Sequence, residues 1–354
     1  MSYKKLGMLL LAVVLFIIGT AIYTPSDKPN TEDDIEVSQT LIPKSRSITV
    51  TATGDCTLAT DITTPTDGSF ESKVEEQNHD YTYFLRNFKD LFSSDDLTIV
   101  NFEGTLSTNG EREDKQFAFR GNPEYVNILT SASVEAANLA NNHSRDYGEI
   151  SLLDTKETLN GAGIVNFIGD DIAYMDISGI KVGLVGINAL NDEGVTSMTT
   201  HIKTAKGNGA ELVILSIHWG IEKEVEPTQE QRELAHKAVD AGADLVIGTH
   251  PHVIEGVEKY NGRYIVYSLG NFCFGGNTAP SDMDTMVMRA TLTLDENNMF
   301  TDDDKISFIP CRISSSSGIN DYQPCIAQGE ERTRIEQKIK ERTELIAPLE
   351  LTFE

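Results

Sequence analysis

Basic residues are scarce in this chain of 354 residues. It carries 29 lysines and arginines against 55 aspartates and glutamates, a formal net charge of −26 at pH 7. Proteins bind nucleic acid by neutralising phosphates with Lys and Arg, so this balance weighs against a nucleic-acid partner. The sequence also has no internal repeat and no low-complexity tract. With 39% hydrophobic residues, the chain is expected to form one large globular domain with accessory segments.

Long apolar runs are absent except from Leu6 to Tyr23. This run of eighteen residues is close to the ~20 that cross a bilayer. Two lysines precede it and several acidic residues follow it, which predicts a single-pass anchor in the cell membrane, residues 1–23, with the bulk of the chain extracellular. A cleaved signal peptide is the alternative, because Gly19-Thr20-Ala21 has the small residues of a cleavage site. No cysteine follows the run to accept a lipid.

Cysteine is also rare, with four residues in the chain. Cys311 and Cys325 flank a segment rich in Ser and Gly, and a disulfide closing that loop would stabilise the fold by ~3 kcal/mol. Cys56 and Cys273 each lie just beyond an expected strand. Their positions are compatible with a disulfide, with free buried thiols or with metal ligation, and the sequence leaves these three options open.

Segment composition divides the chain. Residues 24–46 are acidic and contain prolines, which indicates a flexible linker. Residues 47–326 show strands alternating with helices, which predicts a layered α/β domain. Within it, residues 276–326 change pattern: Met286 to Leu294 has apolar residues at every second position, so an antiparallel strand is expected here, in a second sheet or a lid. Residues 327–354 are expected to contain a charged amphipathic helix.

Polar residues follow the apolar strands at five places. In a parallel α/β sheet the carboxyl ends of the strands open onto one crevice, so these residues are expected to meet there. His250 and His252 flank a proline, and on an extended segment their side chains would point the same way. The residues predicted to share the crevice are Asp55, Glu103, Asn142, His143, His218, His250 and His252.

This set mixes carboxylate and amide oxygens with imidazole nitrogens. Such ligands suit Mn²⁺, Fe or Zn²⁺ better than Mg²⁺ or Ca²⁺. One or two divalent ions held there would clamp a phosphoryl group and activate a water molecule. Metal-assisted hydrolysis is therefore the expected chemistry, with Asp55 and His143 as the candidate catalytic residues.

Six motifs in order resemble those of the CapA family of capsule synthesis proteins, which is linked to poly-γ-glutamate capsules. The family is similar to the calcineurin-like metallophosphoesterases, and this resemblance implies an αββα sandwich of two facing β-sheets flanked by helices. It also implies one ion held by Asp55, Glu103 and His252 and another by Glu103, Asn142, His218 and His250, with His143 as the general acid. The motifs are Gly54-Asp55-Cys56-Thr57-Leu58, Asn101-Phe102-Glu103-Gly104, Asn138-Leu139-Ala140-Asn141-Asn142-His143, His218-Trp219-Gly220, Gly248-Thr249-His250-Pro251-His252 and Ser268-Leu269-Gly270-Asn271-Phe272.

The sequence departs from the phosphoesterase pattern at three positions. Thr57 stands where that pattern has a histidine, Glu103 replaces an aspartate, and Thr249 stands where relatives often carry another histidine. A two-metal site, a single-metal site and a catalytically silent site all remain open. Arg120 and Asn271 are the candidate substrate-binding residues, since a cation at the crevice rim would meet a carboxylate or phosphate.

The resemblance implies a membrane-anchored extracellular protein acting in capsule biosynthesis, export or attachment. Its expected partners are the membrane, an anionic capsule polymer or a phosphorylated envelope substrate, and a membrane-bound polymer synthase complex. Two alternatives come from other classes. One is an extracellular metal-dependent phosphatase or phosphodiesterase acting on envelope components, and the other is a non-catalytic polymer-binding subunit.

Overall fold

The computed structural model describes residues 45–301 and 305–354. The predicted membrane anchor and nearly all of the predicted linker lie outside these residues. Within them, every helix is too short or too polar to cross a bilayer.

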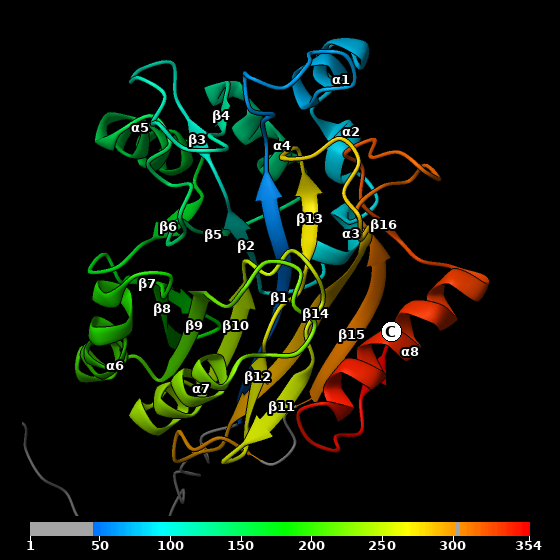
Figure 1. Cartoon of the computed structure of the whole chain (residues 1–354). Coiled ribbons are helices and arrows are strands. Elements are labelled where there is room, and N and C mark those ends of the chain that lie inside the picture. Colours follow the sequence, from blue (N-terminus) through cyan, green and yellow to red (C-terminus); the bar gives the residue numbers. More distant parts are fainter. Residues whose placement is uncertain (1–44, 302–304) are drawn as a thin grey trace, which may run out of the picture. The chain divides into compact units, whose positions relative to one another are not determined.

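The central strand of the larger sheet is β1 (Figure 1). Nine of the described strands form this sheet in the order β16-β15-β14-β1-β2-β5-β6, with β13 also paired to β1 and β17 to β15. β1 runs parallel to β2 and β13 and antiparallel to β14. The strands are β1 Arg46–Thr57, β2 Leu97–Phe102, β5 Ala136–Asn138, β6 Val165–Phe167, β13 Asn271–Phe274, β14 Asp284–Leu294, β15 Lys305–Arg312, β16 Cys325–Ile326 and β17 Thr352–Phe353.

A second sheet contains six of the described strands in the order β11-β12-β10-β9-β8-β7. Its three central strands, β8, β9 and β10, are parallel, so their carboxyl ends lie at one edge. A short two-stranded ladder joins β3 Thr105–Leu106 to β4 Arg120–Gly121. The strands of the second sheet are β7 Ala173–Ile177, β8 Ile180–Asn188, β9 Leu212–His218, β10 Leu245–Thr249, β11 Val257–Tyr260 and β12 Arg263–Val266.

Three clusters of buried apolar residues define the layers. The first contains Val50 and Ile99 from the large sheet and Ile214 and Ile247 from the second sheet, so the two sheets face each other across it. The second lies between the large sheet and helices α1 to α5, and the third between the second sheet and helices α6 and α7. The predicted mixed α/β class is confirmed, with helices on the outer face of each sheet. The helices are α1 Phe70–Glu76, α2 Thr82–Leu85, α3 Lys89–Phe92, the 3-10 turn η1 Pro123–Tyr125, α4 Val126–Ser131, α5 Glu149–Gly161, α6 Asp192–Gly207, α7 Gln229–Ala241 and α8 Gly329–Glu344.

Local sequence explains the helix that follows β9. Thr228 caps α7 with its side chain on the backbone N–H of Gln231, and the Gln231 side chain returns to the backbone of Thr228. This capping box satisfies two donors that the first helical turn leaves free. Gly242 ends the helix with a φ of 113°, a left-handed conformation that glycine adopts without steric cost.

The antiparallel strands beyond residue 276 do not form a second sheet or a lid. β14 pairs with β1 along most of its length, from Arg46 opposite Leu294 to Ala52 opposite Met288, and β15 pairs with β14. The predicted strand exists, but it extends the large sheet. Alternation along one strand shows which face is buried and carries no information about the neighbouring strand.

The C-terminal helix α8 runs along the side of β15 (Figure 1). Its apolar residues Ile335 and Ile339 are fully buried in the cluster between the sheets. The chain after α8 forms β17, which pairs with β15 and which the sequence did not predict. All four cysteines are free thiols, three of them buried, so neither suggested disulfide is present.

Candidate metal centre

Strand ends from both sheets converge on one polar cluster. Asp55 lies near the end of β1, and Glu103 follows β2. In the second sheet His218 ends β9 in register with Thr249, which ends β10 and precedes His250. The parallel arrangement therefore brings side chains that lie far apart in the sequence to one edge, as the strand-end pattern predicted.

The inner part of the cluster consists of Asp55, Glu103 and His218. All three are fully buried, and one ligand atom from each lies within 4.8 Å of the others. The Glu103 Oε1 atom is 3.6 Å from His218 Nε2. Two carboxylates and an imidazole held this closely form a compact set of ligands for a divalent ion.

Neighbouring side chains fix the imidazole of His218. Its Nδ1 atom lies 3.0 Å from the hydroxyl of Thr249, one of the positions that departs from the phosphoesterase pattern. Its Nε2 atom lies 2.8 Å from Asn142 Oδ1. Thr249 therefore orients the ring, and the nitrogen that faces Glu103 and Asn142 is the one available to a metal.

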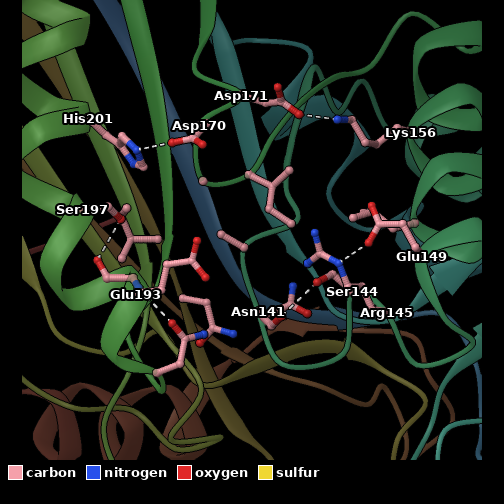
Figure 2. A pocket seen from close by; sticks show the side chains of 18 of the residues that line it. Asn141, Ser144, Arg145, Glu149, Lys156, Asp170, Asp171, Glu193, Ser197 and His201 are labelled. Atoms are coloured by element: carbon pink, nitrogen blue, oxygen red, sulfur yellow. Dashed lines mark hydrogen bonds and ion pairs between the residues drawn. The ribbon is translucent and has the colours of Figure 1, made fainter.

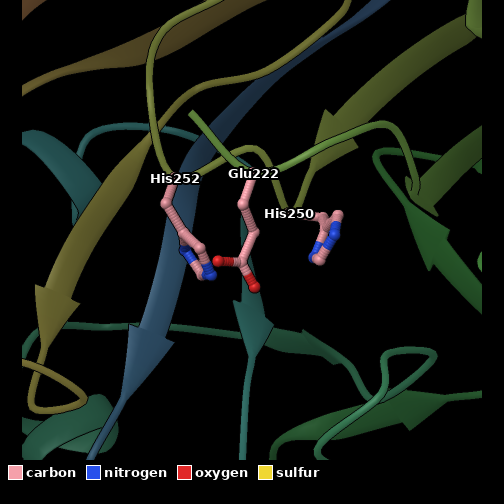
Figure 3. Close-up of side chains that lie close together, drawn as sticks. All are labelled: Glu222, His250 and His252. Atoms are coloured by element: carbon pink, nitrogen blue, oxygen red, sulfur yellow. The ribbon is translucent and has the colours of Figure 1, made fainter. Parts of the chain in front are cut away.

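The outer part of the cluster consists of Glu222, His250 and His252, whose side chains converge in Figure 3. One ligand atom from each lies within 4.8 Å of the others. His252 Nδ1 is 3.1 Å from Asp55 Oδ2, so the outer and inner parts touch. Glu222 was missed because it lies in an exposed loop without any pattern; its only sequence signal is its position four residues after His218.

The segment carrying the two histidines is not extended, contrary to expectation. His250 has a φ of 98° and His252 a φ of 58°, both in the left-handed region that residues with a side chain rarely adopt. The two rings nevertheless lie 5.8 Å apart, centroid to centroid. The convergence that the sequence predicted is reached through a strained turn instead of a straight segment.

Three buried atoms of the cluster have no hydrogen-bond partner among the described residues: Asp55 Oδ2, Glu103 Oε1 and His250 Nδ1. Buried polar atoms are usually paired, because an unpaired one loses its water without compensation. Divalent cations would satisfy these atoms, which are divided between the inner group (Asp55 and Glu103) and the outer group (His250). The residues present therefore fit a metal centre.

Burial and neighbouring charges set the protonation of the cluster. Burial, reinforced by the nearby His250, holds the pKa of His218 well below its usual value. Burial and the charge of His252 lower the pKa of His250 to about 4. Both imidazoles are therefore neutral at pH 7, the form that coordinates metals.

The pKa values of Glu103 and His252 are raised instead. Burial, followed by repulsion from Asp55, raises the pKa of Glu103 to about 7. Burial lowers the pKa of His252, but Glu103 and Asp55 outweigh it and bring that pKa to about 10. Two adjacent buried carboxylates thus hold positive charge at this point, which is the electrostatic character of a cation site.

His143 forms a buried pair with Asp146. The His143 Nδ1 atom is 2.7 Å from Asp146 Oδ2, and the same carboxylate accepts hydrogen bonds from the backbone of Phe119 and from Lys115. The imidazole is therefore fixed in tautomer and direction, with its Nε2 atom left for another partner. Asp146 was not predicted, although it lies only three residues after His143.

A cavity of about 470 Å³ opens beside this cluster, and His143, Glu222, His252 and Asn271 all line it. Three phenylalanines, Phe117, Phe119 and Phe274, form much of its apolar wall. The predicted substrate-binding residue Asn271 lies at the cavity, where its Oδ1 atom is 2.8 Å from His252 Nδ1. Asn271 therefore orients the imidazole of His252, and its contact with substrate stays a prediction.

Arg120 lies outside the residues that line this cavity. Its guanidinium stacks over the ring of Tyr147 at 4.0 Å and donates to the backbone carbonyls of Asn109 and Gly110. These contacts hold the Arg120 guanidinium against its own protein. A role of Arg120 in substrate binding stays a prediction.

A second cavity of about 420 Å³ lies between α5 and α6 (Figure 2). Three ion pairs line it: Arg145 with Glu149, Lys156 with Asp171, and His201 with Asp170. The basic side chains that line this cavity are thus each paired with a carboxylate. This cavity lacks the dense set of ligands found at the strand ends.

The fold and the site define a two-sheet α/β protein with a strand-end cluster of carboxylates and imidazoles. Residues 49–276 match the family described as bacterial capsule synthesis protein PGA_cap, and the chain belongs to this family. The family predicted from the six motifs is therefore confirmed. All the residues of the cluster lie within the matched region.

Two curated relatives are similar to this chain. The PGA biosynthesis protein CapA of Bacillus subtilis (strain 168) is 32% identical over 231 residues, which cover 58% of this chain and 60% of the relative. The capsule biosynthesis protein CapA of Bacillus anthracis is 29% identical over 221 residues, 54% of each chain. The chain thus spans little more than half the length of the curated relatives it matches.

Among solved structures, one described as a novel phosphatase from Mycoplasma pneumoniae is 15% identical, with a TM-score of 0.45 over 75% of this chain and 94% of that one. Because the TM-score is below 0.5 and the identity is low, this similarity does not assign a reaction to the chain.

Proposed function

We propose that this protein acts in the biosynthesis, export or attachment of an anionic capsule polymer of the poly-γ-glutamate type, through a metal-dependent site of the metallophosphoesterase kind. The observation that carries the proposal is the strand-end cluster, which offers two groups of ligands. The ligand atoms within each group lie within 4.8 Å of one another, and the groups are Asp55, Glu103 and His218, and Glu222, His250 and His252. The names of the two Bacillus relatives support the capsule role.

The metal centre would contain one or two divalent ions, Mn²⁺, Fe or Zn²⁺. Its ligands would be drawn from Asp55, Glu103, Asn142, His218, His250 and His252, because these residues provide the mixed oxygen and nitrogen set that such ions prefer. A bound divalent ion would polarise a phosphoryl or carbonyl oxygen and lower the pKa of a coordinated water.

The chain's own residues supply binding and proton transfer. His143, oriented by Asp146 at 2.7 Å, faces the cavity and would give a proton to the leaving group. Lys223 also lines the cavity and is exposed, so its ammonium would bind an anionic substrate there. The phenylalanines that line the cavity, Phe117, Phe119 and Phe274, would reduce the access of water to a bound substrate.

The proposed location is the outer face of the cell membrane, with residues 1–23 as a single-pass anchor. The support is the charge asymmetry around the apolar run in the sequence. The proposed partners are the membrane, the anionic polymer and a membrane-bound polymer synthase complex.

Metal analysis of the full chain, purified in mild detergent, tests the metal centre. We expect one or two bound ions in the wild type and a loss of metal in His250→Ala. His236→Ala is the matched control, because His236 lies on α7 and pairs with Glu258 outside the cluster. Equal metal content in wild type and His250→Ala would remove His250 as a ligand, and a wild type without bound metal would remove the metal centre.

A hydrolysis assay and a cellular assay then test the role. Mn²⁺-dependent cleavage of an aryl phosphate, lost in Asp55→Asn, would support catalysis. Replacing the native gene by the Asp55→Asn variant should abolish the surface polymer. Normal polymer in cells that express Asp55→Asn would contradict an active site that serves capsule formation.

A second candidate function is an extracellular phosphatase or phosphodiesterase that acts on envelope components. The pairing of His143 with Asp146 beside the cavity favours it over a non-catalytic polymer-binding subunit, which has no use for an oriented proton donor. This candidate predicts aryl phosphate hydrolysis together with normal surface polymer in the Asp55→Asn strain. A non-catalytic subunit predicts no hydrolysis in the wild type.

A further inference from the structure

The loop between β9 and α7 holds Glu222 against the segment that carries the two outer histidines. The backbone N–H of Lys223 donates a hydrogen bond of 2.8 Å to the carbonyl of Pro251, the residue between His250 and His252. Lys223 adopts a φ of 68°, a conformation that residues with a side chain rarely take. The loop is thus built to present Glu222 at this point.

Glu222 is exposed, yet its side chain points toward both imidazoles (Figure 3). One of its carboxylate oxygens and one nitrogen from each of His250 and His252 lie within 4.8 Å of one another. Ligands of a zinc ion lie ~2.0–2.2 Å from the metal, so two of them are separated by at most ~4.4 Å. A small rotation of the exposed Glu222 side chain is enough to close the remaining distance.

A second observation points to a ligand at the same place. His250 is only 7% exposed, and its Nδ1 atom has no hydrogen-bond partner among the described residues. A buried imidazole nitrogen without a partner is costly. A metal ion between His250, His252 and Glu222 would remove this cost.

We propose that Glu222 is the third protein ligand of an outer metal ion held by His250 and His252. The ion would then have two imidazoles and one carboxylate as protein ligands and a further position open to the cavity, the arrangement of many catalytic zinc sites. The inner ion would be held by Asp55, Glu103 and His218. This inference rests on the proposed metal centre and changes the allocation of ligands that the family resemblance implied.

The three proposed ligands of the outer ion differ in how firmly the fold holds them. His250 and His252 lie in the strained turn after β10. Glu222 is an exposed side chain, and its movement costs little free energy. Glu222 is therefore the ligand that an incoming anionic substrate displaces most readily. Loss of its carboxylate should weaken the outer ion selectively and leave the buried inner ion in place.

Zinc titration of the full chain, purified in mild detergent and stripped with a chelator, tests the proposal. Calorimetry would measure the number of sites and their affinities, and mass spectrometry the retained metal. We expect two sites in the wild type and at least a tenfold weaker outer site in Glu222→Gln, with the inner site unchanged. Glu222→Asp keeps the carboxylate on a shorter arm and should lie between the two.

Glu224→Gln is the matched control, because Glu224 is exposed on the same loop and its substitution removes the same charge. We expect it to bind zinc like the wild type. His250→Ala separates the two proposals. If His250→Ala loses the outer site while Glu222→Gln keeps wild-type affinity at both sites, Glu222 is not a ligand and the metal centre stands. If the wild type binds no zinc, both proposals are overturned.

Discussion

The C-terminal helix α8 is predicted to hold the histidine segment in place although it lies outside the region that matches the family, residues 49–276. Arg342, in the last turn of α8, donates to the backbone carbonyl of Ile254, two residues after His252. A Cβ atom on Gly256 would lie 2.4 Å from the Arg342 carbonyl, so the segment and the helix are in direct contact. Arg342→Met removes the charged donor and keeps the aliphatic part of the side chain.

Two interactions contribute to the expected effect. A hydrogen bond from a charged group to a buried partner contributes ~1.5–3 kcal/mol. The guanidinium also lies 3.6 Å from Asp282, with the Arg342 side chain 13% exposed and that of Asp282 18% exposed, and such a partly screened pair adds ~0.5–1 kcal/mol. Arg342→Met should therefore lower the free energy of unfolding by ~2–4 kcal/mol.

Urea denaturation measures this change as a lower midpoint with an unaltered slope. Lys340→Met is the matched control on the same helix, because Lys340 is exposed and its ammonium lies 5.1 Å from the centre of the Phe353 ring. We expect this substitution to change stability by less than ~1 kcal/mol. Because Ile254 is close in sequence to His252, Arg342→Met should also weaken metal binding. If Arg342→Met and Lys340→Met were equally stable, α8 would not hold the histidine segment.

Three further predictions concern single side chains. Asp146→Asn should lower kcat for aryl phosphate hydrolysis by ~10²-fold or more, since His143 loses the acceptor that orients it. KM and metal content should stay unchanged. A fall in metal content would contradict a positioning role for Asp146. Burial raises the pKa of Glu255 from 4.5 to about 8, so the stability linked to this group is complete below pH ~4.5 and is lost as the pH rises to ~8, by at most ~5 kcal/mol. Glu255→Gln should flatten that decline in unfolding measured at pH 5 and pH 8, and an unchanged slope would refute the assignment. Gly248→Ala places a Cβ atom 2.0 Å from a backbone carbonyl of the neighbouring strand and should destabilise by ~3 kcal/mol or more in thermal unfolding, whereas Gly161→Ala, with open space around it, should not.

The strand-end residues could be predicted from the sequence because each follows an apolar run. Asp55, Glu103, His218 and His250 were found in this way, and a parallel strand fixes the direction in which its carboxyl end points. The pattern of strands and helices did not by itself show that these strands belong to two sheets, which only the family resemblance implied. Two facing sheets and one continuous sheet require the same apolar strands, and only tertiary packing decides between them.

Other features depend on contacts that leave no local pattern. Glu222 is an exposed glutamate in a loop, and most such residues are only solvated surface. The pairing of β1 with β14 joins strands more than two hundred residues apart, Arg46 with Leu294, and alternation within either strand is the same whatever its neighbour. Arg120 illustrates the converse: a cation near the predicted crevice suggests substrate binding, but Tyr147 and two backbone carbonyls engage it.

The backbone strain at His250 and His252 links the fold to the chemistry. Residues with a side chain held at positive φ cost ~1–3 kcal/mol each and persist only where surrounding contacts impose them. Here the N–H of Lys223 binds the carbonyl of Pro251, and Asn271 donates to the carbonyl of His252. Glycine at either histidine position would relieve the strain but remove a proposed metal ligand, so under the proposed metal centre the turn serves to direct the two imidazoles. Because a metal ion would bind only the folded arrangement of these side chains, added metal should recover part of the stability that the turn costs.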